Sequence, residues 1–321
     1  MRYVLIGSGN IANTYVAALA GVDGSELVAC VSRSGRAPAS APAIECRTAL
    51  ADVQAPFDAV IVTTPNGLHH EGVLEAARLG KPVLTEKPLD ITRDAMDAMI
   101  AACTRAGVTL AVAFQRRTHP DNLALKRLLD AGALGRIYGA DLSCKFWRDQ
   151  AYYDSAAYRG GWAVDGGGPF MQQACHNIDL YQWFFGMPDA VTALTGTFAH
   201  RIEAEDHGAA LLRYGNGMIG TIVASTAARP GLPARLEVVC EKGVFVTLDD
   251  HIAYWEIDGV AHPGQGGPLA PAANVATLSD SSRHAAILLD FEAAVREGRP
   301  PLADAESARR TSELILQIYG R

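Results

Sequence analysis

An apolar run that leads directly into a glycine-rich turn constrains this chain more than any other feature. Residues 3–6 read YVLI and residues 7–12 read GSGNIA, which fits the pattern G-x-G-x-x-A. In such a turn Gly7 allows a tight bend, Gly9 lets the backbone approach a pyrophosphate, and Ala12 lets helix and strand pack closely. A helix predicted over residues 10–20 would direct its positive end at the phosphates. We therefore predict a dinucleotide site here, with contacts from Gly7, Ser8, Gly9, Asn10 and Ile11.

Apolar runs and amphipathic stretches alternate after this turn. Strands are predicted at residues 27–31, 59–62, 83–84 and 108–113, and helices at 71–79 and 92–106. Thr92 is a predicted N-cap, and Gly107 is predicted to end the same helix. Strands that alternate with helices of this length form parallel βαβ units. We expect a doubly wound Rossmann domain over residues 1–120.

The pattern changes after residue 120. Five strands are predicted without intervening helices, at residues 191–198, 208–214, 218–226, 234–240 and 243–248. The sequence YGNGM at 214–218 favours a tight hairpin, because Asn and Gly accept a positive φ. A loop is predicted for 259–276 and two closing helices for 282–297 and 303–319. The fold class is therefore α/β plus α+β, with a large open, mainly antiparallel sheet in a substrate-binding and oligomerisation domain over residues 121–321.

The end of the second predicted strand bears on the choice of cofactor. A site for NAD usually has a carboxylate there, which binds the ribose 2′-hydroxyl. This chain has Ser32, followed by Arg33. A 2′-phosphate would be repelled by a carboxylate and bound by hydroxyls and a guanidinium. We predict NADP in preference to NAD; the alternative is that Arg33 is a solvated surface residue.

Composition excludes several classes of partner. The formal net charge is −7 and 49% of residues are hydrophobic, with no clustered basic run. We therefore expect neither a nucleic-acid nor a membrane partner. The six cysteines show no CxxC spacing, and residues 1–7 run into a strand without a signal-peptide core. We expect a cytoplasmic protein with free thiols and no metal site.

Several ordered motifs resemble the Gfo/Idh/MocA oxidoreductase family over essentially the whole chain. They are TTPN at 63–66 with His69, GKPVLTEKP at 80–88, GGG at 166–168 and CHNID at 175–179. The resemblance implies a Rossmann domain, a second-domain sheet often used for dimerisation, and hydride transfer with NAD(P). The substrates that it implies are mostly sugars, polyols and nucleotide sugars.

The resemblance also assigns two catalytic residues. Lys87 matches the lysine of the E-K-P motif, and His176 matches the second-domain histidine. We expect His176 to act as acid or base and Lys87 to orient and stabilise the reacting oxygen. Many dehydrogenases of the family have an aspartate four residues before the histidine, where this chain has Gln172. An amide positions groups but transfers no proton, so the usual carboxylate–histidine relay would lack its carboxylate here.

The remaining predicted site residues belong to the substrate or to the cofactor. The stretch 148–162 interleaves arginines with aromatics, which suits a sugar that carries a phosphate or carboxylate, or equally a subunit interface. Asp179 is predicted either to contact substrate or to anchor its helix. Substrate contacts are thus predicted for Gln172, Arg148, Tyr153, Tyr158 and Asp179. Further cofactor contacts are predicted for Ser32, Arg33, Thr64, Pro65, Asn66, His69, Glu86, Lys87, Gln115 and Trp162.

The predicted function is an NADP-dependent oxidoreductase acting on a sugar-type alcohol or carbonyl: a sugar, keto-sugar or nucleotide sugar. We expect a homodimer or homotetramer formed through the second-domain sheet. Two alternatives stay open: a non-catalytic NADP-binding sensor or scaffold, because a fold does not fix a function, and a hydrolase or lyase that uses transient oxidation with retained nicotinamide.

Overall fold

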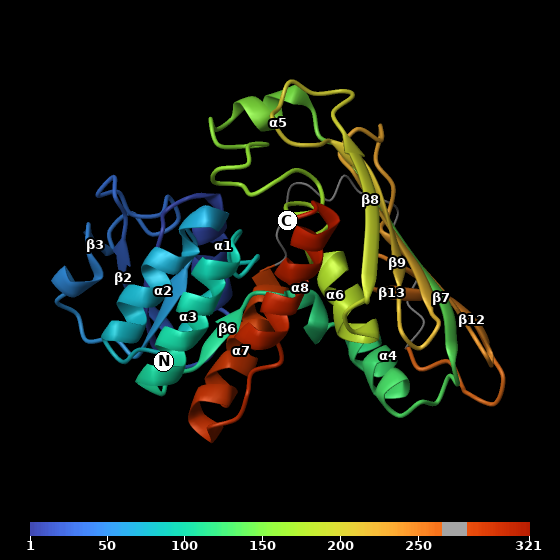
Figure 1. The fold of residues 1–321 in the computed structure, drawn as a ribbon. Helices are drawn as coiled ribbons and strands as arrows, with labels where there is room; N and C mark the ends of the chain where they lie inside the picture. Colours follow the sequence, from blue (N-terminus) through green and yellow to red (C-terminus); the bar gives the residue numbers. More distant parts are fainter. Residues whose placement is uncertain (265–280) are drawn as a thin grey trace. The chain divides into compact units, whose positions relative to one another are not determined.

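The computed structural model describes residues 1–264 and 281–321, which divide into two compact units (Figure 1). The first unit contains Met1–Thr118 together with the described residues from 281 to Arg309. The second contains residues 119–264 and Arg310–Arg321. The helix at 281–297 therefore groups with the first unit, whereas chain order had suggested the second. Of the loop predicted for 259–276, residues 265–276 lie outside the described residues.

The first unit contains a six-stranded parallel sheet. Its strand order is β3-β2-β1-β4-β5-β6, which reverses direction between β1 and β4 as in a doubly wound fold. The predicted Rossmann sheet is confirmed. The strands are β1 (Arg2–Ile6), β2 (Glu26–Val31), β3 (Glu45–Arg47), β4 (Ala59–Val62), β5 (Val83–Thr85) and β6 (Leu110–Val112).

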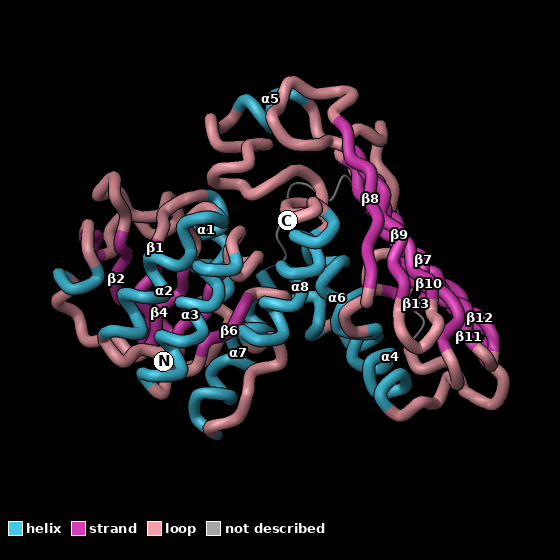
Figure 2. The backbone as a smooth tube through the Cα atoms, viewed as in Figure 1, coloured by secondary structure: helices cyan, strands magenta, loops and turns pink. Residues whose placement is uncertain are grey.

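Helices cover this sheet, with α1 packed against α7 and α2 against α3 (Figure 2). The Thr92 hydroxyl accepts a hydrogen bond from Ala95 N at the start of α3, and Gly107 ends that helix at φ 64°. Both predicted caps are confirmed. The helices are α1 (Asn10–Leu19), α2 (His69–Arg78), α3 (Arg93–Ala106) and α7 (Ser281–Glu297), with short 3-10 helices η1 (Leu50–Asp52), η2 (Asn66–Leu68) and η3 (Gln115–Thr118).

Long-range contacts explain why α7 belongs to the first unit. The Tyr3 hydroxyl of β1 donates to Glu292 Oε1 at 2.9 Å. Phe291 is fully buried, with its ring centroid 6.5 Å from that of Tyr3. These partners lie almost the whole chain apart in sequence, so no local pattern could have revealed them.

The second unit contains a seven-stranded sheet of order β13-β12-β11-β7-β10-β9-β8. Among the strand pairs of the described residues in this sheet, only β7–β10 is parallel, which confirms the predicted mainly antiparallel sheet. The hairpin at 214–218 joins β9 to β10, with Gly217 at φ 87°. The strands are β7 (Ile137–Lys145), β8 (Ala190–Gly196), β9 (His207–Arg213), β10 (Ile219–Ser225), β11 (Arg235–Cys240), β12 (Gly243–Leu248) and β13 (His251–Ile257). β7 and β13 were not predicted.

Helices pack on one face of this sheet. α6 (Cys175–Phe185) lies against β7 and against α4 (Pro120–Asp130), and α4 also contacts β13. The short α5 (Gln150–Asp154) lies beyond the strand ends, and α8 (Ala305–Ile318) begins in the first unit and ends in the second. Alternate residues of β9 point away from these helices and are exposed. Within the described part of the chain, no helix is long and apolar enough to cross a membrane.

Candidate active site

The predicted glycine turn follows β1 at the carboxyl edge of the parallel sheet. Gly7 has φ 108°, and a Cβ on it would lie 2.7 Å from Thr63 Oγ1, so both backbone conformation and space require glycine. Gly9 is the N-cap of α1, and a Cβ on it would meet no protein atom within 4 Å. Gly7 therefore serves the fold, whereas Gly9 keeps the start of α1 open to a ligand.

Three serine hydroxyls form a chain where an NAD site would usually have its carboxylate. Ser32 Oγ lies 3.0 Å from Ser8 Oγ and 2.9 Å from Ser34 Oγ. Beside them, Arg33 forms a 3.8 Å ion pair with Glu71 in which both side chains are more than half exposed. Such a pair stabilises the fold by less than about 1 kcal/mol, so Arg33 can readily be recruited by another anion.

His69 joins two of the motifs that carry the family resemblance. Its Nδ1 lies 2.8 Å from the Pro88 carbonyl, and its Nε2 lies 2.9 Å from the Thr64 carbonyl. The ring is fully buried, and burial lowers its pKa although both carbonyls and nearby carboxylates act in the opposite direction. The ring thus holds the segment of Thr64, Pro65 and Asn66 against the segment that follows Lys87.

Glu86 is the buried carboxylate next to Lys87. It accepts hydrogen bonds from the Tyr15 hydroxyl at 2.9 Å and from the Lys87 backbone N–H at 3.2 Å. His284 Nε2 of α7 lies 3.7 Å from the same carboxylate. Burial acts to raise the pKa of Glu86, but His284, Lys87 and Tyr15 outweigh it and the pKa is lowered. Glu86 is therefore a fixed anion that orients the backbone at half-buried Lys87, before a cis peptide bond to Pro88.

Two buried polar atoms at the same edge of the sheet fit a nicotinamide group. Thr85 Oγ1 at the end of β5 and Gln115 Oε1 just after β6 have no hydrogen-bond partner within the described residues. A carboxamide carries both N–H donors and a carbonyl acceptor, so it can satisfy either atom. Together with the glycine turn, these atoms suit the two ends of a nicotinamide dinucleotide.

In the second unit, His176 is the second residue of α6 and is half-buried. Gln172, one turn earlier, donates from Nε2 to the Asp165 carbonyl at 2.9 Å. This bond orients the Gln172 amide. Lys87 and His176 thus belong to different units, each on a locally ordered segment.

The glycine run before His176 is held by a buried carboxylate. Glu205 accepts from the N–H groups of Gly168 at 3.1 Å and Phe170 at 3.4 Å, and from the Tyr319 hydroxyl at 2.8 Å. A Cβ on Gly167 would overlap Tyr319, and one on Gly168 would overlap the Glu205 backbone. Close packing therefore accounts for these glycines. Burial raises the pKa of Glu205 despite these donors.

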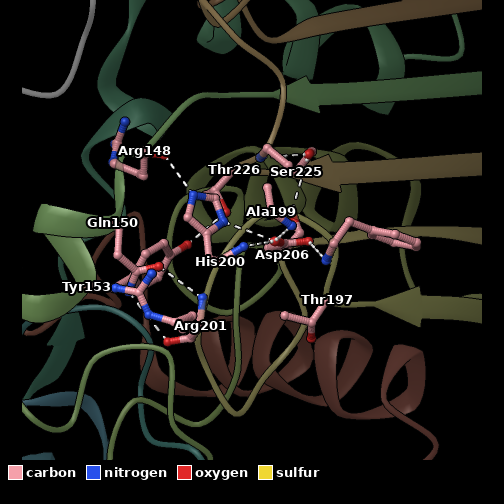
Figure 3. Close-up of polar contacts among 12 residues, drawn as sticks. Arg148, Gln150, Tyr153, Thr197, Ala199, His200, Arg201, Asp206, Ser225 and Thr226 are labelled. Carbon is pink, nitrogen blue, oxygen red and sulfur yellow. Dashed lines mark hydrogen bonds and ion pairs between the residues drawn. The ribbon is translucent and has the colours of Figure 1, made fainter.

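A second buried network supports the start of the 148–162 stretch (Figure 3). His200 Nδ1 lies 3.0 Å from Asp206 Oδ2, and its Nε2 lies 2.8 Å from the Arg148 carbonyl. The ring therefore links the Asp206 carboxylate to the backbone of Arg148. Burial acts to raise the pKa of Asp206, but the backbone N–H groups of residues 198–200 outweigh it and the pKa is lowered.

The other predicted substrate residues differ in their surroundings. Tyr153 is buried, and its hydroxyl lies 2.7 Å from Thr226 Oγ1, which favours a supporting role. Asp179 is fully buried and accepts from the Thr311 hydroxyl at 2.8 Å, which favours its alternative role as a helix anchor. Tyr158 is 38% exposed. Trp162, predicted to contact the cofactor, packs edge-on against Tyr319 beneath the Arg321 guanidinium.

Sequence reasoning did not select several residues that organise these sites. Tyr15 and His284 flank Glu86, and their roles depend on contacts between distant segments. Tyr152 and Arg159 lie in the stretch 148–162 but are not among its predicted substrate contacts. Their signal was the recurrence of arginine and tyrosine over residues 148–159, which shows composition but not stacking.

Comparison with known proteins agrees with this geometry. Residues 1–114 match a family model described as an oxidoreductase family with an NAD-binding Rossmann fold, and residues 122–246 match the GFO/IDH/MocA C-terminal domain. Inositol 2-dehydrogenase 2 of Saccharopolyspora erythraea is 30% identical over 76% of this chain and 72% of its own length. The chain belongs to the Gfo/Idh/MocA family of NAD(P)-dependent oxidoreductases.

Two further relatives extend the comparison within this family. The WlbA dehydrogenase from Bordetella pertussis, solved in complex with NADH and UDP-GlcNAcA, is 31% identical with a TM-score of 0.87, covering 99% of this chain and 95% of that one. D-xylose 1-dehydrogenase (NADP(+)) 2 of Haloferax volcanii is 30% identical over 70% of this chain and 69% of its own length. The relatives thus include proteins named or solved with either nicotinamide cofactor.

Proposed function

We propose that this protein transfers a hydride between NADP and a CH–OH or C=O group of a sugar-type substrate. The family membership supports the reaction class. The relatives named above are an inositol 2-dehydrogenase, a D-xylose 1-dehydrogenase and a dehydrogenase solved in complex with NADH and UDP-GlcNAcA. The observation that carries the choice of NADP is the chain of three serine hydroxyls beside Arg33, where NAD would favour a carboxylate.

The chain's own residues supply the rest of the chemistry. When bound, the cofactor accepts a hydride from the carbinol carbon or gives one to the carbonyl carbon. During alcohol oxidation His176 takes the hydroxyl proton, and during reduction it returns that proton to the oxygen. The Lys87 ammonium stabilises the negative charge that develops on the oxygen. Gln172 holds the segment before His176 in place.

We also propose a homo-oligomer built on the second-unit sheet. Its outward face carries exposed apolar side chains, with Leu194 82%, Leu211 53% and Ile219 58% exposed. Apolar residues gathered on one face favour burial against another subunit. Leu211→Asp should shift sedimentation to the monomer, and an unchanged sedimentation coefficient would contradict this assembly. None of the six cysteines forms a disulfide, which suits the reducing cytoplasm that we propose as its compartment.

A turnover screen tests the proposed reaction. NADPH oxidation would be followed against keto-sugars, and NADP reduction against sugars, polyols and nucleotide sugars. We expect net cofactor turnover with at least one substrate. Cofactor binding without any turnover would favour a sensor or scaffold. Conversion of substrate without net cofactor turnover would favour a hydrolase or lyase with retained nicotinamide.

A further inference from the structure

Two arginines of the second unit share one aromatic ring. The Arg159 guanidinium carbon lies 4.4 Å from the Tyr152 ring centroid, and that of Arg148 lies 5.4 Å from the same centroid. Both arginines are half-buried. Cation–π contacts hold the two planar groups in place but leave most of their N–H donors for another partner.

The charge of this pair is not balanced by a carboxylate. Within the described residues, neither guanidinium forms an ion pair, and the Nε atoms of both are buried without a hydrogen-bond partner. The only polar contact of the Arg148 guanidinium there is to the Trp147 carbonyl at 2.8 Å. Two neighbouring positive charges repel each other, and buried donors without acceptors are costly. An anionic ligand would relieve both penalties.

The carboxylates nearby in sequence bind elsewhere. Asp149 caps α5 by accepting from the Tyr152 backbone N–H at 2.9 Å. Asp154 binds Gln150 at 2.9 Å and Arg201 at 3.9 Å. Asp165 accepts from the Gly160 N–H at 3.0 Å. The acids that could have neutralised the arginines are thus occupied.

Gln173 connects this stack to the candidate acid–base residue. Its Nε2 donates to the Tyr152 hydroxyl at 3.1 Å, and its Oε1 is buried without a partner within the described residues. Gln173 lies three residues before His176, which is the second residue of α6. The stack therefore offers donors for an oxyanion beside an acceptor for a hydroxyl, in the unit that carries His176.

The backbone beneath Arg148 is rigidly held. The His200 ring bonds to the Arg148 carbonyl, and the Arg148 N–H donates to the Thr226 carbonyl at 3.0 Å (Figure 3). Asp206 fixes His200 from its other side. A site held by such supporting contacts binds with less loss of side-chain entropy.

We propose that Arg148 and Arg159, stacked on Tyr152, bind the carboxylate or phosphate of a hydroxyl-bearing substrate. A guanidinium binds either oxyanion through paired, charge-assisted hydrogen bonds. The assignment rests on the proposed sugar-type substrate and narrows it to an anionic sugar, with Gln173 accepting from one of its hydroxyls.

Calorimetric titration of the full-length protein tests the assignment with three probes: D-glucuronate, D-glucose 1-phosphate and the neutral methyl α-D-glucoside. At least one anion should bind about tenfold or more tightly than the glycoside, since charge-assisted hydrogen bonds discriminate at this level. Arg159→Ala should abolish that advantage, and Arg159→Lys should retain part of it. Arg201→Ala, which removes an exposed arginine of the same unit, should leave it unchanged. The anion that responds to Arg159 identifies the group bound.

The assignment is overturned if neither anion outcompetes the glycoside, or if Arg159→Ala and Arg201→Ala behave alike. It is also overturned if sedimentation shows that Arg159→Ala changes the assembly but not anion binding, because the arginines would then serve an interface. Circular dichroism melting confirms that each variant is folded. Turnover of neutral sugars without preference for anions would contradict this assignment alone, whereas Arg159-dependent anion binding without turnover would contradict only the proposed reaction.

Discussion

At the carboxyl edge of the parallel sheet, most groups offered to a ligand are backbone or short side chains. Gly7, Gly9 and Ser32 sit at the ends of strands that the fold itself fixes. At the arginine–tyrosine stack, the groups offered are the ends of long side chains, held by rings and by a buried histidine. The first kind of site depends on backbone conformation, so it tolerates little change. The second depends on individual side chains, so it can be altered for another substrate without loss of the fold.

The largest expected effect is a loss of turnover that leaves cofactor affinity unchanged. His176→Ala should lower kcat by roughly 10²- to 10⁴-fold, as for loss of a general acid or base, while NADPH affinity stays the same because the proposed role of His176 is proton transfer and not cofactor binding. Lys87→Ala should lower kcat comparably. The measurements are steady-state kinetics and fluorescence titration of NADPH. His207→Ala, in the same unit, is the control, and a kcat for His176→Ala equal to that of the control would remove His176 from the mechanism.

Substitutions of the two glycines in the cofactor turn should affect thermal stability and cofactor affinity differently. Gly7→Ala should lower both the melting temperature and cofactor affinity, because its positive φ and the contact with Thr63 cost about 1–3 kcal/mol. Gly9→Ala should melt like the wild type but bind NADPH roughly tenfold or more weakly, because the added methyl group faces the phosphates. Thermal unfolding with and without NADPH distinguishes the two. Equal melting temperatures for the two variants would contradict the assignment of Gly7 to fold stability and of Gly9 to cofactor binding.

Substitutions at Arg33 and Ser32 should change the cofactor preference and leave anion binding at the arginine–tyrosine stack unchanged. Arg33→Ala should reduce the ratio of NADP to NAD affinity by about tenfold, since a charge-assisted contact to the 2′-phosphate is lost. Ser32→Asp should move the preference toward NAD. Arg36→Ala, the next arginine along the chain, is the control. Stronger binding of NAD than NADP by the unaltered protein would overturn the proposed specificity.

The smallest expected effect is a pH dependence in the first unit. Because burial lowers the pKa of His69 from its ordinary 6.5, the unfolded chain binds the proton more readily than the folded one. His69 therefore contributes stability above pH 6.5 that is lost as the pH falls below it. Urea unfolding at several pH values should show a shallower acid loss for His69→Gln than for the wild type. Parallel curves would show that His69 is not the group responsible.

The contrast between the two regions also marks what sequence could reveal. The glycine turn, the Thr92 cap, the Gly107 helix end and the 214–218 hairpin depend on neighbouring residues, and each was predicted correctly. β7 was missed because its partners β10 and β11 lie far along the chain, and its own residues include Gly139 and Asp141.

The residues of the candidate site also fall into two groups: those that local motifs identify and those that only tertiary contacts identify. Lys87 and His69 stand in local motifs that point to them directly. The contacts of Tyr152 with two arginines, the His284 contact with Glu86 and the support of Arg148 by His200 all arise in tertiary structure. Residue types alone leave the 148–162 stretch open between a substrate site and a subunit interface. The shared ring, and the lack of an ion pair to either guanidinium within the described residues, favour the substrate site.

Hydride transfer between NADPH and the substrate can be followed atom by atom with an isotope label. The protein would be incubated with NADPH deuterated at the transferable C4 position and a keto-sugar found in the turnover screen, and the product analysed by mass spectrometry and NMR. We expect deuterium on the carbinol carbon of the sugar, with a matching loss of NADPH absorbance. A product without deuterium, or formed without net loss of NADPH, would contradict the account.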